Sequence, residues 1–477
     1  MLNYSTYLNE LRDEAGENYP LINPHTREEI EEIPECTNEQ METAIAKSLA
    51  AFEKLKTWSS AERSEVLERT ARIVEENSER FAKAIVNEAG KPVRFAKGEV
   101  ARTVETLKFS AIEARKLEGE SIRLDAANNG GGRDAYTIYE PIGVIGAITP
   151  FNFPLNLVIH KVGPAIAAGN TIVVKPAEKT PLSSLLLREA FLEAGLPEGA
   201  FQVITGEGPR LGKVLIDHEE VAKITFTGSP EVGKLIKSQS GLKKVTLELG
   251  NNSALYIDES QHERLDDIAQ KAVVGAFSYN GQVCISTQRI YVHEAVAEEF
   301  TRHFIEATSQ LKYGDPLEES TDLSALIDEK SQKRLLEWIV EASHNGAEIV
   351  HGGKACQNGI EPTILKSVQA SDKVSCQEVF GPVVIVNAVK SGQEALAEMN
   401  NSNYGLNAGI FTTDLSQALQ MSHQLDVGQV LVNDIPTLRF DHMPYGGRKD
   451  SGYGYEGVKY AVREMVKRKM ISLNYSF

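Results

Sequence analysis

The chain has 477 residues, of which 42% are hydrophobic and 25% are charged, so it is long enough for two or three domains with separate cores. Its formal net charge of −17 and pI of about 5.2 disfavour general binding to nucleic acid or to anionic membranes. The composition is therefore typical of a globular enzyme.

The first residues, MLNYSTYLNELRDEAGENYP, have neither the basic start and apolar run of a secretory leader nor the pattern of an organellar one. No stretch approaches the ~18 unbroken apolar residues of a membrane helix, so we expect a cytoplasmic protein. The cysteines form no CxxC pair and no histidine cluster has ligand spacing, so we expect neither a disulfide framework nor a metal site. The cysteines are Cys36, Cys284, Cys356 and Cys376.

Residues 38–117 carry apolar positions at three- and four-residue spacing, which predicts scaffold helices. Residues 118–141 form two strand-like runs around the Gly-rich tip AANNGGG, which predicts a projecting hairpin. From 142 to 249, and again from 251 to 434, short β-branched runs alternate with helical segments, which indicates two α/β units with parallel sheets. The tail KMISLNYSF alternates like an edge strand.

Cys284 lies in FSYNGQVCISTQRIYV, at the end of a predicted helix and just before a predicted strand. A thiol at such a junction can reach a cleft between domains, where nearby N–H dipoles favour the reactive thiolate. A lone cysteine among apolar neighbours is more often an inert core residue, so its position alone does not establish catalysis.

Two polar side chains end other predicted strands. Glu248 lies in KVTLELGNNSA, and the C-terminal end of a buried strand faces the crevice that binds ligands in open α/β sheets. The alternative is a solvated carboxylate at a strand end. Asn152 lies in AITPFNFPLNLVIHK, where its amide can donate to a developing oxyanion or simply cap the next helix.

Seven motifs occur in the order and approximate spacing of one superfamily: TPFNFPL, KPAEKTP, FTGSPEVG, LELG, GQVC, EVFGPV and PYGGRKDSGYGYEG. On these motifs the chain resembles the aldehyde dehydrogenases from about Leu21 to the C-terminus. The resemblance implies an NAD-dependent oxidation of a small aldehyde to its carboxylic acid. It also implies an α/β fold with a Rossmann-like NAD-binding domain, an α/β catalytic domain and a small β oligomerisation arm. The expected ranges are 1–117 and 142–249 for the NAD-binding domain, 250–434 for the catalytic domain, 118–141 and 460–477 for the arm, and 435–459 for a connection to the site.

The resemblance assigns the chemistry to three residues. Cys284 attacks the aldehyde carbon, and the Asn152 side chain with the Cys284 backbone N–H holds the oxyanion of the thiohemiacetal. Hydride leaves to the nicotinamide and a thioester remains on Cys284. Glu248 then deprotonates the water that hydrolyses the thioester, which suits a carboxylate whose pKa is raised by partial burial.

The chain lacks a GxGxxG directly between a first strand and helix, and GEGPRLG and GSPEVG are weak signals by themselves. By resemblance, Lys175 and Glu178 hold the adenosine ribose hydroxyls, and the Glu178 carboxylate repels a 2′-phosphate, so NAD is favoured over NADP. Glu378 and Phe380 hold the nicotinamide ribose and flank the ring. The full set of expected cofactor residues is Thr149, Phe151, Lys175, Glu178, Gly208, Gly228, Ser229, Glu378 and Phe380.

Two positions depart from the family pattern. Phe151 stands where many relatives carry Trp, and Asn251 replaces the second Gly of LELGG. The larger side chain of Asn251, beside the expected base, can alter cofactor positioning, but neither change removes a chemical function.

The substrate side is less specific. His160 follows Asn152 by two helical turns, so helical periodicity lets it point toward the cleft, although a helix histidine is more often a packing residue. With Lys108, Arg439 and His442 it forms our set of candidates for an anionic or hydroxylated substrate tail. The sequence resembles the lactaldehyde and glycolaldehyde branch, which also contains phosphonoacetaldehyde and sulfolactaldehyde enzymes.

Other readings stay open. A CoA-acylating semialdehyde dehydrogenase shares the fold and nucleophile but typically lacks the Glu at position 248, and a phosphorylating glyceraldehyde-type enzyme needs a different motif set. An idle binding or structural protein predicts eroded catalytic residues, which are intact here. We expect a small aldehyde as substrate and a homodimer or homotetramer, with the hairpin around 121–139 and the strand near 470–475 joined across a subunit boundary.

Overall fold

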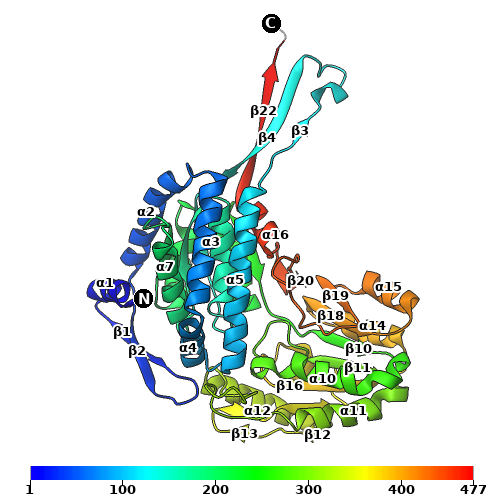
Figure 1. Ribbon diagram of the computed structural model, residues 1–477. Coiled ribbons are helices and arrows are strands. Elements are labelled where there is room, and N and C mark those ends of the chain that lie inside the picture. The colour runs from blue at the N-terminus through cyan, green and yellow to red at the C-terminus, as the bar shows by residue number, and fades with distance from the viewer. Residues whose placement is uncertain (1, 476–477) are drawn as a thin grey trace.

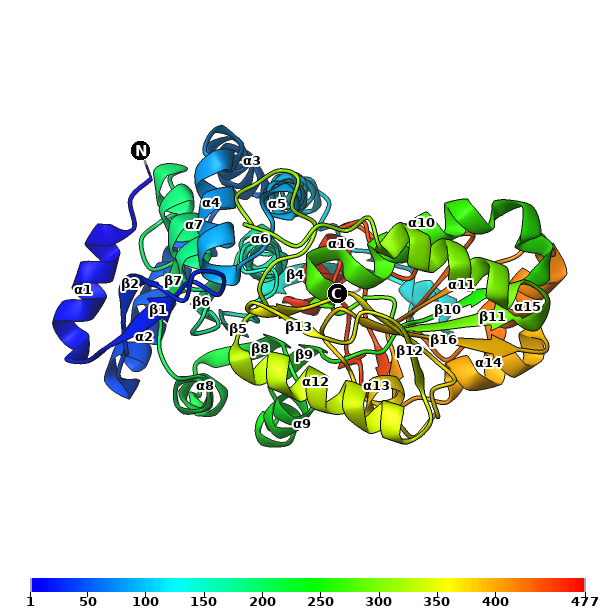
Figure 2. The ribbon, with the colours of Figure 1, turned by 90° about the horizontal axis from the view of Figure 1, so that it is seen from below.

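Three sheets of three or more strands organise the computed structural model, which describes residues 2–475 (Figure 1). Two larger sheets lie in separate lobes, side by side, and a three-stranded arm projects away from both (Figures 1 and 2). The expected mixed α/β fold, with Rossmann-like and catalytic domains and parallel sheets, is confirmed.

The first lobe contains a six-stranded sheet in which five neighbouring strands are parallel and the edge strand β21 pairs antiparallel with β9. Its strands are rich in Val, Ile and Thr and almost wholly buried, as expected for a parallel sheet covered on both faces. In sheet order they are β21 (Gly452–Tyr453), β9 (Lys244–Glu248), β8 (Val221–Thr227), β5 (Val144–Ile148), β6 (Thr171–Lys175) and β7 (Phe201–Val203).

Helices cover both faces of this sheet, with α8 and α9 on one side and α5 and α6 on the other (Figure 2). Ser59 caps α3 through a capping box with Glu62, and Gly90 ends α4 with a φ of 63°. The helices of this lobe are α1 (Ser5–Ala15), α2 (Asn38–Leu55), α3 (Ser60–Glu76), α4 (Ser78–Ala89), α5 (Val93–Arg115), α6 (Asn156–Ala167), α7 (Leu182–Glu193), α8 (Gly208–Asp217), α9 (Pro230–Gln239) and α16 (Val458–Glu464).

The second lobe contains a seven-stranded sheet, parallel except for its edge strand β12. In sheet order its strands are β12 (Glu348–His351), β15 (Thr363–Lys366), β16 (Val383–Val389), β11 (Arg289–His293), β10 (Ala254–Ile257), β18 (Asn407–Phe411) and β19 (Gln429–Val432). Its helices are α10 (Leu265–Phe277), α11 (Glu294–Thr308), α12 (Glu329–His344), α13 (Lys373–Cys376), α14 (Gly392–Asn400) and α15 (Leu415–Gln424).

The arm is formed by β22 and the hairpin of β3 and β4. The antiparallel register of β22 runs from Val466 opposite Pro141 to Asn474 opposite Arg133, so the terminal strand covers all of β4. The arm strands are β3 (Ser121–Ile122), β4 (Arg133–Pro141) and β22 (Val466–Asn474). The terminal strand therefore pairs with its own chain, and α16 before it packs on α5 and α6 rather than on the arm.

Short elements complete the chain, and several were not expected from the sequence. Within the helical region predicted over residues 38–117, Asn77 separates α3 from α4. The remaining elements are β1 (Asn18–Ile22), β2 (Glu29–Pro34), β13 (Ala355–Cys356), β14 (Gly359–Ile360), β17 (Tyr404–Gly405), β20 (Arg448–Lys449) and the 3-10 turns at Leu124–Ala126, Glu259–Arg264 and Ser278–Gly281. Across residues 2–475 the helices are all too short or too polar to span a membrane. In the same range no cluster of His, Cys, Asp and Glu is suited to hold a metal ion.

Candidate active site

The loop that carries Cys284 follows α10 through an abrupt break in the helix. Tyr279, Asn280 and Gly281 have positive φ angles of 48°, 55° and 67°. Asn280 donates from Nδ2 to the carbonyl of Ala325 (2.8 Å) and accepts from the backbone N–H of Ser324 (2.9 Å), so its strained conformation is held from both sides. The loop that presents the thiol is therefore fixed by the second lobe's own connections.

The Cys284 sulfur lies 3.1 Å from the hydroxyl of Tyr445. Burial raises the pKa of the Cys284 thiol, whereas the Tyr445 hydrogen bond and the charge of Arg439 act in the opposite direction. The carboxyl groups of Glu248 and Glu378 also raise it, which places both expected acids within electrostatic reach of the sulfur.

Asn152 is buried in the loop between β5 and α6 and donates from Nδ2 to the carbonyl of Gln282, two residues before Cys284 (3.1 Å). Glu99 fixes this loop, because its Oε1 accepts the backbone N–H groups of Leu155 (2.9 Å) and Asn156 (3.0 Å) at the start of α6. Helix N-termini favour such a carboxylate. The amide of Asn152 is thereby held against the loop of Cys284.

Glu248 ends β9 and is buried, and neither of its carboxyl oxygens has a hydrogen-bond partner. Burial and the neighbouring Glu456 carboxylate raise the pKa of Glu248 well above its ordinary value. Glu456 is different: burial opposes its ionisation, but Lys161, His160 and Arg439 overcome that effect and lower its pKa to about 2. Glu248 is therefore the carboxyl group of this pair that is protonated more readily.

At the adenosine end expected from the sequence, Lys175 and Glu178 form an ion pair (2.7 Å), and Glu178 accepts the backbone N–H of Gly208 (2.5 Å). A Cβ on Gly208 would lie 3.0 Å from the Glu178 carboxyl and 3.3 Å from the Lys175 ammonium, so a side chain here would press on this ion pair. Thr149, at the end of β5, is buried with a hydroxyl that lacks a partner. An orphaned donor and a glycine-lined cradle fit a dinucleotide.

At the nicotinamide end, Glu378 accepts the backbone N–H of Asn251 (3.0 Å), and burial raises the pKa of Glu378 to about 8. Phe151 and Phe380 form an edge-to-face pair with ring centroids 5.7 Å apart. Phe151, which stands where many relatives carry Trp, therefore still places an aromatic ring beside Phe380.

Gly228 and Ser229 lie between β8 and α9. The N–H of Gly228 donates to the Glu248 carbonyl (3.0 Å), and Ser229 caps α9 by accepting from Val232 (3.4 Å). The N-terminus of α9 thus begins beside the strand end that carries Glu248.

Two of the expected substrate residues meet in a buried network. His160 Nε2 lies 2.9 Å from Asp441 Oδ1, and Arg102 donates to the same oxygen over 2.6 Å. Arg439 lies 3.5 Å from the His160 ring and 3.4 Å from Glu456. We call His160, Arg102, Arg439 and Asp441 the tail cluster, after the substrate tail for which His160 and Arg439 are candidates. Arg439 also acts electrostatically on the Cys284 thiol.

The other two candidates lie elsewhere. Lys108 is half-exposed on α5 and pairs with Glu105 on the same helix (3.2 Å), so no described contact brings it to the cluster. His442 is exposed, and its ring packs against Phe109 of α5, with ring centroids 4.9 Å apart. Sequence reasoning missed Arg102, Asp441, Glu456 and Tyr445; only Tyr445 and Glu456 lie in a recognised motif, PYGGRKDSGYGYEG.

Comparison with known proteins places this geometry in context. Residues 11–471 match the sequence profile of the aldehyde dehydrogenase family. A 3-sulfolactaldehyde dehydrogenase from Priestia aryabhattai is 43% identical over 99% of this chain and 98% of that protein. The crystal structure of aldehyde dehydrogenase 21 from Physcomitrella patens, in complex with the reaction product succinate, is 38% identical, covers 96% of this chain and 95% of its own, and has a TM-score of 0.94.

A glyceraldehyde-3-phosphate dehydrogenase from Methanocaldococcus jannaschii, solved with NADP, is 35% identical, with a TM-score of 0.91 over 96% of this chain and 99% of its own. Both the sequence and the fold are thus shared over nearly the full length of these proteins. The chain belongs to the aldehyde dehydrogenase family and is an oxidoreductase that acts on small aldehydes with NAD or NADP.

Proposed function

We propose that this enzyme oxidises a small aldehyde with an anionic or hydroxylated tail to its carboxylic acid, through a thioester on Cys284, and that it prefers NAD. The observation that carries the proposal is the approach of three loops to one sulfur atom. Asn152 reaches the Cys284 loop, the buried acid Glu248 acts electrostatically on the thiol, and Tyr445 lies against it.

In the mechanism, the Cys284 thiolate attacks the aldehyde carbon and forms a thiohemiacetal. The Asn152 amide and the Cys284 backbone N–H donate to its oxyanion, because charge develops where donors already lie. The dinucleotide, when bound, accepts the hydride that leaves this carbon. The residues of the cradle would orient the dinucleotide and exclude water. Cys284 retains the acyl group as a thioester.

Glu248 completes the cycle by taking a proton from the water that attacks the thioester. Both of its oxygens lack partners in the protein, so they are available to a water molecule. A general base works best when its pKa lies near the working pH, and the raised pKa of Glu248 moves it in that direction. The presence of this residue favours hydrolysis over transfer to CoA.

The tail cluster supports an anionic or hydroxylated substrate. Burial and Arg439 lower the pKa of His160, while Asp441 stays ionised, because its pKa lies below the ordinary range despite burial. A neutral His160 that donates from Nε2 to Asp441 has an acceptor at Nδ1, and this atom is buried without a partner. Arg439 Nε is a buried donor without a partner. One free acceptor and one free donor suit a tail with a hydroxyl and an anionic group.

The charge of the surrounding groups points the same way. Three cations, Arg102, Lys161 and Arg439, face two ionised carboxylates, Asp441 and Glu456. Among these five groups the positive charges outnumber the negative charges by one. A buried charge is stabilised by a partner, and a substrate anion or the Cys284 thiolate can supply it.

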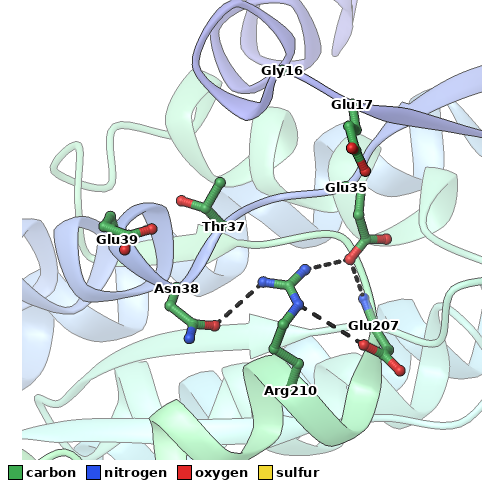
Figure 3. A pocket seen from close by; sticks show the side chains of 8 residues that line it. All are labelled: Gly16, Glu17, Glu35, Thr37, Asn38, Glu39, Glu207 and Arg210. Carbon is green, nitrogen blue, oxygen red and sulfur yellow. Dashed lines mark hydrogen bonds and ion pairs between the residues drawn. The ribbon is translucent and has the colours of Figure 1, made fainter.

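The preference for NAD is supported by the start of α8 (Figure 3). The N–H of Glu207 donates to Glu35 (2.8 Å). The next N–H, of Gly208, donates to Glu178 (2.5 Å). These are the helix N-terminal donors that would otherwise attract a phosphate. Protein carboxylates therefore already accept from these donors, which favours a cofactor without a 2′-phosphate.

Arg210, which lines the same pocket, is already paired with protein groups. Arg210 contacts the Glu35 carboxylate and the Cys36 carbonyl (2.7 Å), and its Nε lies 3.9 Å from Glu207 (Figure 3). Its charge is thus compensated within the protein. A neutral ribose diol fits this acidic surrounding better than a phosphomonoester does.

An aldehyde panel tests the proposed function, with kcat/KM measured from NADH formation with NAD and with NADP. The panel contains lactaldehyde, glycolaldehyde, sulfolactaldehyde, succinate semialdehyde, glyceraldehyde 3-phosphate and benzaldehyde, each with and without CoA. We expect kcat/KM for the anionic and hydroxylated members to exceed that for benzaldehyde by about tenfold or more. These substrates can pair with the free donor and acceptor of the tail cluster, which benzaldehyde would leave unpaired. A preference for benzaldehyde would contradict the substrate class, and CoA-dependent product would favour the acylating reaction.

A further inference from the structure

A tyrosine hydroxyl lies directly on the reactive sulfur. The phenol oxygen of Tyr445 is 3.1 Å from Cys284 Sγ, and Tyr445 is only 1% exposed. A buried phenol needs a hydrogen-bond partner, and the partner that the structure provides is the sulfur. A phenylalanine would fill the same space but could not make this contact.

The direction of this hydrogen bond depends on the state of the sulfur. When Cys284 is a thiol, either atom can be the donor. A thiolate has no hydrogen, so the phenol of Tyr445 must then donate. Hydrogen bonds to an ionised acceptor are roughly twice as strong as neutral ones. The contact therefore stabilises the thiolate more than the thiol.

Arg439 lies over the ring face of Tyr445. The centre of its guanidinium lies 3.6 Å from the centroid of the Tyr445 ring. The Arg439 side chain is 5% exposed and is held by Glu456 (3.4 Å) and His160 (3.5 Å), so the stacked position is fixed. A cation on the face of the ring is attracted by the π electrons, and its charge also favours a nearby thiolate.

Other groups act against the thiolate. Burial disfavours the charged form of Cys284, and the carboxyl groups of Glu248 and Glu378 do so as well. Tyr445 and Arg439 are the two groups that act in the opposite direction. They offset the opposing effects only in part, because the pKa of Cys284 remains above its ordinary value with both groups in place.

We propose that Tyr445 is a catalytic residue that holds the Cys284 thiolate through its phenol O–H, and that Arg439 is a positioning residue that fixes this phenol by stacking on its ring. The proposal rests on Cys284 as the nucleophile of the proposed function. It concerns the resting enzyme, so it can be tested without any aldehyde.

The test is the pH dependence of Cys284 alkylation by iodoacetamide, followed by mass spectrometry of the peptide that contains Cys284. In Tyr445→Phe we expect the midpoint of the rate profile to move to higher pH by about one unit or more, which slows alkylation at neutral pH by about tenfold. The rate at high pH, where the thiolate is fully formed, should stay near that of the parent enzyme. A role limited to packing would change the unfolding temperature and not the midpoint.

Two further substitutions separate the contributions of charge and stacking. Arg439→Met should move the midpoint in the same direction as Tyr445→Phe, whereas Arg439→Lys should restore part of the parent profile because a cation can still lie over the ring. The matched control is Tyr7→Phe. Tyr7 is also buried, donates to the Val203 carbonyl (2.9 Å) and has the Arg188 guanidinium 3.6 Å above its ring, but it belongs to α1. Its loss should leave the profile unchanged.

An unchanged midpoint in Tyr445→Phe would overturn the proposal, as would an equal shift in Tyr7→Phe. A shift in Arg439→Met alone would also overturn it, because the cation would then act without the phenol. Failure of the proposed function would be a separate result. Turnover by a variant that lacks Cys284 would show that Cys284 is not the nucleophile, whereas the alkylation profile of the parent enzyme would stay the same.

Discussion

The side chain of Asn251 donates a hydrogen bond from Nδ2 to the carbonyl oxygen of Cys284 over 3.0 Å. The same amide nitrogen reaches Ser253 Oγ at 2.5 Å, and Oδ1 accepts from the backbone N–H of Leu406 at 3.4 Å. Asn251 stands where the family pattern has glycine, which could make none of these side-chain bonds. The larger residue thus ties the loop after Glu248 to the loop of the nucleophile.

We expect Asn251→Ala to lower kcat/KM by about two- to tenfold, because one neutral hydrogen bond contributes ~0.5–1.5 kcal/mol. Steady-state assays measure the effect. The matched control is Asn358→Ala, which removes an amide that donates to the His25 carbonyl (2.8 Å) in another part of the chain. Equal activity of Asn251→Ala and the control would show that the tie to Cys284 does not position the thiol.

Glu248→Gln should lower steady-state turnover by about 10²- to 10⁴-fold, the usual contribution of a general base. The first turnover should still release NADH in a burst, because the base acts after hydride has left. Stopped-flow absorbance distinguishes the two phases. Normal steady-state hydrolysis in this variant would show that another group is the base.

The pH dependence follows from the same carboxyl group. The raised pKa of Glu248 means that the unprotonated base becomes more abundant as pH rises toward that pKa. Steady-state kcat limited by hydrolysis should therefore increase from neutral to alkaline pH, and this limb should be lost in Glu248→Gln. A kcat that falls over the same interval would contradict the assignment.

The sequence identifies the functional loops better than the contacts between them. Cys284, Glu248 and Asn152 could be singled out because they lie in motifs that resemble those of the aldehyde dehydrogenases, at predicted strand and helix ends. Partners far apart in the sequence could not be predicted. Arg102 and Asp441 form one ion pair across 339 positions, and no local pattern marks either of them.

Lys108 illustrates the same limit. It lies on α5, the helix that also supplies Arg102, so the helix was identified correctly. The spacing of the two residues is not a multiple of the helical repeat, and Lys108 therefore lies on an outer face. Tyr445 could not be identified for a different reason. It lies in a recognised motif, but its contact with Cys284 joins residues 161 positions apart in the sequence.

Glu178→Ser should raise the ratio of NADP to NAD kcat/KM by about tenfold or more, which corresponds to ~1.4 kcal/mol. The substitution removes the charge that caps Gly208 and would lie beside a 2′-phosphate. The double substitution with Glu35→Gln should raise the ratio further, because it also releases Arg210. An unchanged ratio in both variants would show that these carboxylates do not select the cofactor.

We expect the full chain to form at least a dimer through its arm, and a version that ends at Lys469 to lose that assembly. The arm has few buried residues of its own, and Tyr136, Met470 and Leu473 are exposed on it. Such uncovered strands favour pairing with another subunit. Light scattering measures the masses, and a full-length monomer or an unchanged truncated oligomer would contradict this expectation.

The most direct test of the central claim is NADH formation by Cys284→Ala in the presence of the best aldehyde of the panel, with NAD binding followed by protein fluorescence in the same preparation. We expect binding of NAD to remain within about threefold of the parent value, because the thiol is not among the groups of the adenosine cradle. Turnover should be absent, since no other described side chain replaces the sulfur beside Asn152 and Glu248. Measurable steady-state NADH formation by this variant would remove Cys284 from the mechanism.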